Sequence, residues 1–402
     1  MIKDNSNRNA YESVEFARLA TGLDVSSPFY CGQEILDRLP STLRGHELDR
    51  CFLVTSPGLR ALYGAEMAAA LNRSGARCET ILISDSEADK SWGTLSKLCE
   101  DLVAAGATKD SVLLACGGGV IGNVVGLAAG LLYRGVRFVE VPTTVQAQTD
   151  GALSNKQAIN GDAGKNQFGT YHAPLFVWAD FAYPRSEPLR QRKAGVVEGI
   201  KNVLVSQTDT AAADRMLELA ADVDRLGELL PRLIQSKLDI IRKDPTERAY
   251  GVVLEYGHTF GHAVEWLSGG TLFHGEAVAI GMCLAARLSQ RLGYLCEELA
   301  EAHFRLLSQL GAPTALPPEM STQSIYESIL GDNKRTARGV KFVLLSRCGQ
   351  VVDPDGDYMV AVPRDDVLAV LDEFPRAPVS LEEKSRSRKS SRTRDISIRR
   401  FR

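Results

Sequence analysis

The sequence predicts an α/β fold in which a half of alternating strands and helices is followed by an α-helical half. Up to about residue 195, short apolar runs alternate with amphipathic helical patterns, and beyond that point the pattern is helical. The composition is that of a globular protein, with 44% hydrophobic and 24% charged residues. At about 150 residues per domain, the 402 residues suggest two domains, which we place at 1–195 and 196–378, followed by a tail at 379–402.

The first half contains short apolar runs that are predicted strands: Cys51–Thr55, Thr80–Ile83, Val112–Ala115, Arg137–Val141 and Leu175–Ala179. The segments between them have helical patterns: Gly58–Ser74, Ser91–Ala105 and Gly122–Leu132. This alternation is typical of a mostly parallel sheet with helices on both faces.

The second half is predicted to be helical in these segments: Gly195–Ser206, Thr210–Ala221, Leu226–Lys243, Val252–Leu267, Gly275–Leu292 and Cys296–Leu310. A short strand, Lys341–Leu345, is expected after the basic turn Asp332–Arg338. No internal repeat is visible.

Charge, cysteine content and hydropathy indicate the class of protein. The eight cysteines form no CxxC pair, which favours reduced thiols and a cytoplasmic location. The polar N-terminus lacks the apolar core of a signal peptide. The longest apolar run, Val120–Leu132, is too short to span a membrane and is expected to be a buried helix. The net charge of −3 gives no indication of a nucleic-acid partner.

Positive charge is concentrated at the C-terminus. Residues 384–402 contain nine Lys or Arg and one Asp, a local charge of +8, so the rest of the chain carries −11. The alternation of serine and arginine favours a solvated, disordered tail, with an anion-binding arm as the alternative.

A glycine-rich turn, CGGGVIGNVVG at Cys116–Gly126, follows an apolar strand and opens a helix. Gly117, Gly119 and Gly122 fit a G-x-G-x-x-G spacing, which lets the backbone approach a pyrophosphate at a helix N-terminus. The alternative is an ordinary tight turn. The segment Ser84–Lys90 (SDSEADK) could place an acidic group and a lysine at a ribose and a phosphate, or be a solvated loop.

Histidine is scarce, yet three of the six histidines fall within 17 residues. His258 and His262 are four apart and share one helix face, and His274 begins the next predicted helix. With Glu198 as a candidate carboxylate, they form a plausible divalent-metal site with open coordination positions. The alternative is a set of satisfied core histidines.

The polar segment Asp150–Asn166 contains Lys156 and Lys165 and few bulky groups. Its position after a strand suits binding of phosphate or a polyol, whereas an exposed loop is the alternative.

These motifs, in this order, resemble the sugar-phosphate cyclases, the superfamily of 3-dehydroquinate synthase. The resemblance extends from about Cys51 to Leu345 and rests on these segments: GGGVIGN, YRGVRF with VPTT, DGALSNKQAIN with GKN, VVEGIKN, YGHTFGHAVE, FHGEAVAIGM and DNKR. It implies a Rossmann-like NAD-binding domain followed by an α-helical metal-binding domain, assembled as a homodimer.

The resemblance also implies roles for individual residues. The implied ligands of one divalent metal, Co2+ or Zn2+, are Glu198, His258 and His274. The implied NAD contacts are Ser56, Glu87, Lys90, Gly118, Gly119, Asn123, Thr143, Thr144, Asp150, Lys165 and Asn166. The implied substrate contacts are Asp150, Lys156, Lys165, Asn166, Lys237, Lys334 and, from the partner subunit, Arg134. The implied catalytic residues are Lys156, Lys201, Glu255 and His262. His262 is expected to contact the metal ligands without binding the metal itself, and Glu255 and Lys156 are the acid/base candidates.

The chain departs from the 3-dehydroquinate synthase pattern at four positions. Asn123 replaces an aspartate, Gln157 follows the lysine of SNKQAIN, Glu255 replaces an asparagine, and Gly251 replaces an arginine. SNKQAIN, Glu255 and Asn123 resemble the branch that converts D-glucose 6-phosphate into 2-deoxy-scyllo-inosose for aminoglycoside biosynthesis; valiolone-forming cyclases fit less well.

The implied reaction comprises transient oxidation by NAD, phosphate elimination, reduction, ring opening and an intramolecular aldol step. Two alternatives stay open. One is 3-dehydroquinate synthase or another cyclase, and the other is an NAD- and metal-dependent polyol dehydrogenase.

Overall fold

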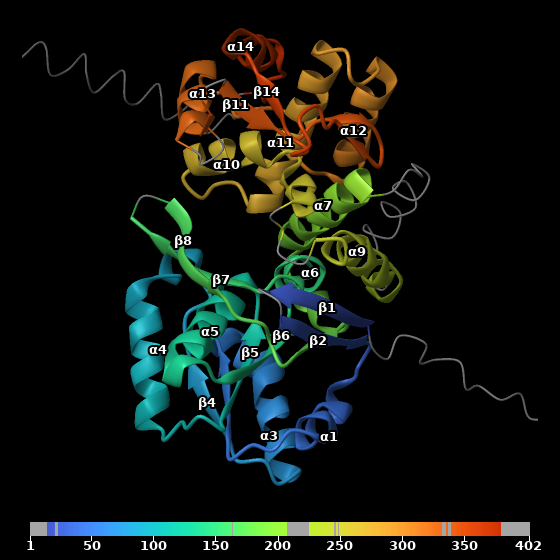
Figure 1. Ribbon diagram of the computed structural model, residues 1–402. Coiled ribbons are helices and arrows are strands. Elements are labelled where there is room, and N and C mark those ends of the chain that lie inside the picture. Colours follow the sequence, from blue (N-terminus) through green and yellow to red (C-terminus); the bar gives the residue numbers. More distant parts are fainter. Residues whose placement is uncertain are drawn as a thin grey trace, which may run out of the picture.

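The computed structural model describes residues 14–20, 23–162, 164–206, 225–244, 247, 249–331, 335–336 and 339–378. The predicted helix Thr210–Ala221 and the basic tail lie outside these residues. An α/β half and a helical half are stacked on each other, with the β7–β8 hairpin running up one side of the α/β half toward the helical half (Figure 1).

The α/β half is organised around a seven-stranded sheet with the order β1-β2-β9-β6-β5-β3-β4, in which only the β1–β2 pair is antiparallel. The strands are β1 (Val14–Ala20), β2 (Leu23–Gly32), β3 (Cys51–Thr55), β4 (Cys78–Leu82), β5 (Val112–Gly117), β6 (Arg137–Pro142) and β9 (Phe176–Asp180).

The central strands are apolar because both faces of the sheet are covered. Every residue of β3, β5 and β9 is buried. Side chains from α4 (Trp92–Ala104) and α5 (Gly119–Leu131) pack with Phe52 and Phe138 on one face. On the other face, α1 (Leu39–Arg44) and α3 (Ala65–Arg73) pack with Leu53.

The predicted α/β alternation is confirmed, with strand ends that differ by a few residues. Sequence analysis missed β1 and β2, which extend one side of the sheet. The predicted helix Gly58–Ser74 is interrupted: α2 (Pro57–Leu59) is followed by a π-helical turn at Arg60–Gly64 and then by α3. The buried helix expected at Val120–Leu132 is confirmed as α5.

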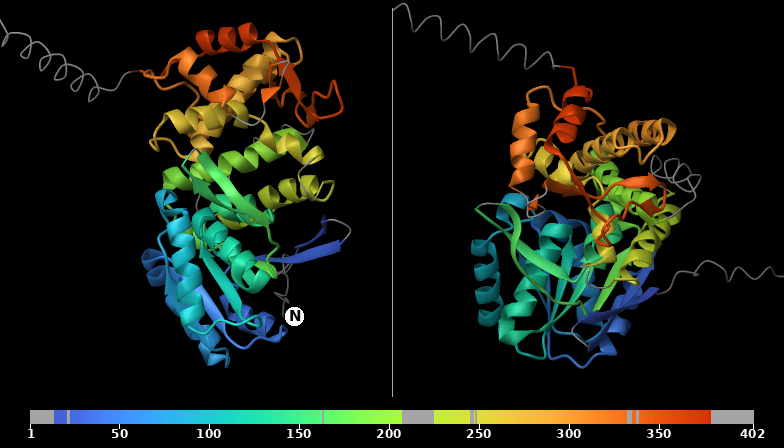
Figure 2. Two further views of the ribbon diagram at one scale, coloured as in Figure 1. Left: turned by 60° about the vertical axis from the view of Figure 1, so that its left-hand side comes forward. Right: turned by 45° about the horizontal axis from the view of Figure 1, so that its top comes forward.

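The polar segment that we expected to be a binding loop is mostly a β-hairpin. After α6 (Val145–Thr149), strand β7 (Lys156–Gly161) pairs antiparallel with β8 (Gly164–Tyr171). The hairpin crosses over α5 (Figure 2). One face of β7 packs on α5, whereas almost all of β8 is exposed.

The helical half is built around α11, which is buried along nearly its whole length. Its helices are α7 (Leu189–Ser206), α9 (Leu226–Ile241), α10 (His258–Leu267), α11 (His274–Arg291), α12 (Glu297–Leu310), α13 (Thr322–Leu330) and α14 (Arg364–Glu373). A 3-10 turn, Tyr250–Glu255, separates α9 from α10, so the helix expected at Val252–Leu267 begins six residues late.

Glycines allow α10 and α11 to approach closely where the candidate ligands lie. Gly257, just before α10, has φ +79°, and a Cβ there would stand 2.7 Å from Met282 Cγ. A Cβ on Gly281 would stand 2.1 Å from the Gly257 carbonyl oxygen. Any larger residue at either position would push the start of α10, and His258 with it, away from α11.

Small sheets complete the C-terminal part: β10 (Arg335–Thr336), β11 (Gly339–Phe342) and β14 (Val360–Val362) form one, and β12 (Leu345–Arg347) with β13 (Gln350–Val351) forms another. The strand expected at Lys341–Leu345 is therefore divided between β11 and β12. In the part of the chain that the structure describes, no helix has the length and apolar character needed to cross a membrane.

Candidate active site

Three histidines converge where α10 meets the start of α11. A ring nitrogen from each of His258, His262 and His274 lies within 4.8 Å of the others. His258 and His262 occupy successive turns of α10, and their ring centroids are 5.1 Å apart. His274 is the first residue of α11, with its centroid 5.3 Å from that of His258. His258 is buried, His274 half-buried and His262 exposed.

Glu198, from the middle of α7, completes this cluster. Its Oε1 lies 3.4 Å from His274 Nε2 and 3.7 Å from His258 Nε2. Its Oε2 accepts a hydrogen bond of 2.6 Å from Lys201 Nζ, one turn further along α7. Both Glu198 and Lys201 are almost completely buried.

The Glu198–histidine cluster fits a divalent cation. Glu198 Oε1 is buried and has no well-formed hydrogen bond among the described residues, although it faces two imidazole nitrogens. Ligand atoms about 2.1 Å from one tetrahedral ion lie roughly 3.4 Å from each other, close to the separations seen here. Two imidazoles and one carboxylate suit Zn2+ or Co2+, and His262 is the nearest further donor.

Protonation in the cluster follows burial and the nearby carboxylates. Burial and the charge of Lys201 lower the pKa of His258 to about 3, which keeps its imidazole neutral. Burial also disfavours protonated His274, but the carboxylates of Glu198 and Glu265 outweigh it and raise its pKa to about 10. Although burial opposes ionisation of Glu198, Lys201 and the histidines hold the pKa of its carboxyl group well below the usual value.

Glu265, on α10, connects this cluster to the hairpin and was missed by sequence analysis. One carboxylate oxygen lies 2.9 Å from His274 Nδ1, and the other accepts a hydrogen bond of 2.5 Å from Lys165 Nζ. Its spacing, three residues after His262 and seven after His258, puts it on their helix face, and this was an available signal.

Alternating ammonium and carboxylate groups lie between the hairpin and α9. Lys156, at the start of β7, pairs with Glu247 at 2.7 Å, and Glu247 also accepts a hydrogen bond from Ser154 Oγ. Lys237, buried on α9, pairs with Asp150 at 2.5 Å. Glu247 was missed because it comes from an irregular segment with no recognisable spacing; its φ is +53°.

The glycine-rich turn fits an anionic cofactor. Gly118 precedes α5 and supplies no side-chain acceptor, so the first N–H groups of a 13-residue helix are left without a side-chain cap. A Cβ on Gly118 would approach Thr144 Cγ2 to 3.2 Å. Thr143 Oγ1, at the end of β6, is buried without a hydrogen-bond partner among the described residues. Ser56, after β3, caps α2 and donates a hydrogen bond to Asp85.

A second group of predicted cofactor residues gathers at the hairpin. Lys90 Nζ donates to Asn166 Oδ1 at 2.5 Å, and Glu87 accepts a hydrogen bond from Asn160 Nδ2 at 2.9 Å. Lys165 Nζ lies 3.7 Å from Glu87. Burial lowers the pKa of Lys90. The segment Ser84–Lys90 thus forms a structured junction with the hairpin.

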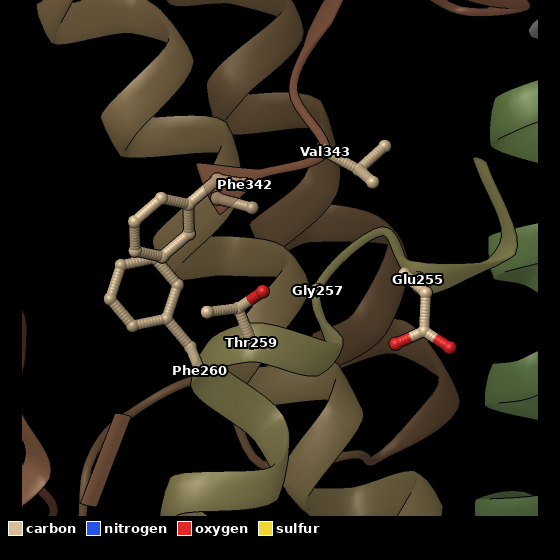
Figure 3. A pocket seen from close by; sticks show the side chains of 7 residues that line it. Glu255, Gly257, Thr259, Phe260, Phe342 and Val343 are labelled. Carbon is tan, nitrogen blue, oxygen red and sulfur yellow. The ribbon is translucent and has the colours of Figure 1, made fainter. Parts of the chain in front are cut away.

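Glu255 lies three residues before His258 and is half-buried. Its side chain extends away from the apolar contact of Phe260 with Phe342, where Thr259 and Val343 also lie (Figure 3). The cavity at that contact leaves no room for a water molecule. The charge of Glu255 favours the protonated form of His258, although burial and Lys201 outweigh this effect on its pKa.

Four further residues singled out in the sequence have these positions. Gln157 is buried against α5, where a Cβ on Gly126 would stand 2.4 Å from its amide carbon, so it does not share the face of Lys156. Asn123 accepts a hydrogen bond of 3.1 Å from the Ala158 backbone N–H and thereby fixes the hairpin to α5. Arg134 is exposed beyond the C-terminal end of α5. Lys334 lies outside the described residues.

Comparison with known proteins assigns both halves to one family. Residues 80–194 match the 3-dehydroquinate synthase N-terminal family and residues 195–335 the 3-dehydroquinate synthase C-terminal family. The chain is 36% identical over 363 residues to the 2-deoxy-scyllo-inosose synthase of Streptomyces kanamyceticus, covering 88% of this chain and 93% of that protein. The 2-deoxy-scyllo-inosose synthase of Niallia circulans is 34% identical over 76% of this chain and 84% of its own length.

Solved structures agree with the sequence comparisons. A crystal structure of 2-deoxy-scyllo-inosose synthase complexed with carbaglucose-6-phosphate, NAD+ and Co2+ matches 90% of this chain and 99% of its own, with a TM-score of 0.83 and 30% identity. A 2-epi-5-epi-valiolone synthase from Streptomyces hygroscopicus with NAD+ and Zn2+ bound shares the fold, with a TM-score of 0.77 and 24% identity over 88% of this chain and 98% of its own. The chain belongs to the 3-dehydroquinate synthase family of sugar-phosphate cyclases, and it resembles the 2-deoxy-scyllo-inosose synthases of that family over nearly its whole length.

Proposed function

We propose that this protein is a 2-deoxy-scyllo-inosose synthase, a phosphate-eliminating lyase that converts D-glucose 6-phosphate into 2-deoxy-scyllo-inosose and phosphate. The observation that carries the proposal is the candidate metal cluster, which lies beside ammonium and carboxylate groups drawn from both halves of the chain. Relatives bearing that name match the chain along most of its length. In this reaction no electron is gained or lost overall.

The donor sets on the chain indicate where its cofactors would bind. Glu198, His258 and His274 would hold one divalent cation, and the α5 N-terminus with Thr143 would hold the NAD pyrophosphate. When bound, NAD supplies a transient hydride acceptor at the sugar, and the cation stabilises the alkoxide and polarises the ketone.

The remaining side chains provide binding and proton transfer. Lys156 carries an ammonium group that is about half exposed and is oriented by Glu247, so it can donate hydrogen bonds to phosphate or hydroxyl oxygens. We assign proton transfer to Glu255, whose charge acts on His258, and to Lys156, whose ammonium group is oriented by Glu247. Lys201 and Lys237 neutralise Glu198 and Asp150, which allows the buried Glu198 and the half-buried Asp150 to stay ionised.

The test is incubation of the protein with D-glucose 6-phosphate, a catalytic amount of NAD+ and Co2+. We expect inorganic phosphate and the carbocyclic ketone to form in equal amounts, with many turnovers per NAD+ and no net accumulation of NADH. Stoichiometric NADH from a simple alcohol, without phosphate release, would instead identify a polyol dehydrogenase.

We further propose that the protein acts as a homodimer in which Arg134 serves the partner's site. The 13 residues of α5 separate Arg134 from the glycine-rich turn by about 20 Å. Tyr133 and Arg134 have φ values of +50° and +68°, a costly conformation that is retained where function or packing requires it. Exposed Leu131, Tyr133 and Tyr171 provide apolar surface near this turn, and the exposed strand β8 pairs only with β7 among the described residues.

Mixing subunits tests this arrangement. Arg134→Ala and His258→Ala homodimers should each be nearly inactive, whereas a heterodimer of the two variants should regain activity. If Arg134 crosses the interface, one site of the heterodimer carries both lesions and the other site carries none. Activity should approach half that of the wild type per heterodimer. Verified heterodimers with no recovery would show that Arg134 acts within its own subunit.

A further inference from the structure

Glu265, on α10, is a carboxylate that the proposed function does not use. Its carboxylate is largely buried, with 8% of the residue exposed, yet each of its oxygens contacts a different half of the protein. Oε2 lies 2.9 Å from Nδ1 of His274 on α11. Oε1 accepts a hydrogen bond of 2.5 Å from Nζ of Lys165 on β8. A single side chain therefore connects the candidate metal ligand with the hairpin of the α/β half.

The contact to His274 determines which of its ring nitrogens can bind a metal. A carboxylate beside Nδ1 requires the proton to sit on Nδ1. Nε2, the other ring nitrogen, faces Glu198 Oε1 at 3.4 Å. A histidine ligand that donates its second N–H to a carboxylate has a fixed ring orientation and a more basic donor atom.

The contact to Lys165 links the same carboxylate to the hairpin. The ammonium group of Lys165 also lies 3.7 Å from Glu87. The next residue, Asn166, accepts a hydrogen bond from Lys90. The described residues of β8 are otherwise mostly exposed and have no strand beyond them. The ion pair between Lys165 and Glu265 thus connects the end of the hairpin directly to α10.

We propose that Glu265 is a positioning residue that couples metal binding at His274 to docking of the β7–β8 hairpin against the helical half. The inference rests on the proposed metal set. Coupling between two binding events is reciprocal. The factor by which hairpin docking raises the affinity for the cation should therefore equal the factor by which a bound cation raises the equilibrium constant for hairpin docking. Binding of the metal would in this way hold Lys165 on β8, and with it the paired strand β7 that begins at Lys156, against the helical half.

Calorimetric titration of the metal-free protein with Co2+ tests the first contact. Glu265→Gln removes the negative charge with little change in shape, and the Co2+ affinity should fall about 10- to 100-fold. Lys165→Met leaves Glu265 intact, and the affinity should fall about fivefold through the hairpin alone. The matched control is Glu276→Gln: Glu276 is equally buried, lies two residues from His274 and pairs with Arg190, so the affinity should stay within about twofold.

Hydrogen exchange of the peptides that cover residues 156–171 tests the coupling without measuring turnover. Addition of Co2+ should slow exchange in this hairpin in the wild type and in Glu276→Gln. The protection should be lost in Glu265→Gln and in Lys165→Met, while exchange of the central sheet stays unchanged as evidence of folding.

The possible failures are distinguishable. Unchanged Co2+ affinity in Glu265→Gln, or hairpin protection that persists in this variant, would overturn the coupling role. A His274→Ala protein that still binds Co2+ with wild-type affinity would overturn the proposed metal set itself. Loss of Co2+ in His274→Ala together with full binding in Glu265→Gln would reject only the present inference.

Discussion

Alanine at His274 or His258 is expected to remove the bound metal and to lower turnover by a factor on the order of 10³ or more. Each substitution removes one of three donors from a cluster in which Glu198 Oε1 has no other well-formed contact among the described residues. The loss also leaves the buried Glu198 charge with fewer partners. Binding of NAD should remain within a few-fold of the wild type, because the glycine-rich turn belongs to the α/β half.

Metal analysis after dialysis, turnover of D-glucose 6-phosphate and an NAD titration provide the measurements. His172→Gln is the matched control, since His172 is also half-buried but bonds to the Val136 carbonyl in the α/β half. Residual weak metal binding in either alanine variant should disappear when His262 is also replaced, because its nitrogen lies within 4.8 Å of the others. Full metal occupancy in both alanine variants would refute the ligand assignment.

The α/β half could be predicted because its strands are buried on both faces. The runs Cys51–Thr55 and Val112–Ala115 consist almost entirely of apolar residues and lie between amphipathic helical patterns. A short continuous apolar run in this position is typical of a strand that is buried on both faces. The hairpin could not be found in this way. The strand Gly164–Tyr171 is almost fully exposed and lacks an apolar face, so nothing in its composition separates it from a loop.

The candidate site divides along similar lines. The histidines could be identified from their spacing, since residues four apart share a helix face. Glu247 could not, because it reaches Lys156 from an irregular segment 91 residues away in the chain. The burial of Gln157 follows from the strand itself: adjacent residues of a strand point to opposite faces, so a half-exposed Lys156 implies a buried Gln157.

The substrate is expected to be D-glucose 6-phosphate, in strong preference to a heptulosonate 7-phosphate. A heptulosonate carries a carboxylate as well as a phosphate, so its site benefits from extra cationic groups, and Gly251 stands where the 3-dehydroquinate synthase pattern has an arginine. Here a Cβ on Gly251 would lie 2.9 Å from Glu247 Cβ and 3.1 Å from Asp244 Oδ2. Asp244 closes this segment by accepting hydrogen bonds from the Ala249 and Gly251 backbone N–H groups. No side chain fits at position 251 without rebuilding the turn.

Ionised carboxylates, held by nearby ammonium groups, occupy this region. Glu255 lies close enough to His258 to favour its protonation, and Lys237 and Lys156 hold the pKa of Glu247 below its usual value despite burial. Ionised carboxylates repel the carboxylate of a heptulosonate but can accept hydrogen bonds from sugar hydroxyls. We therefore expect kcat/KM for the heptulosonate to be lower by about 100-fold or more, the scale on which a site rejects a substrate that leaves buried polar groups unmatched.

Glu255→Gln separates proton transfer from binding. If Glu255 moves a proton, kcat should fall about 10²- to 10⁴-fold while KM and Co2+ affinity change only a few-fold. Glu276→Gln serves as the control: Glu276, in the first turn of α11, pairs with Arg190 of α7, and its replacement should leave kcat nearly unchanged. Side-by-side kinetics with both sugar phosphates decide the substrate. Comparable turnover of the heptulosonate would favour 3-dehydroquinate synthase, and a Glu255→Gln variant with wild-type kcat would remove Glu255 from the chemistry, because a glutamine amide cannot act as an acid or a base near neutral pH.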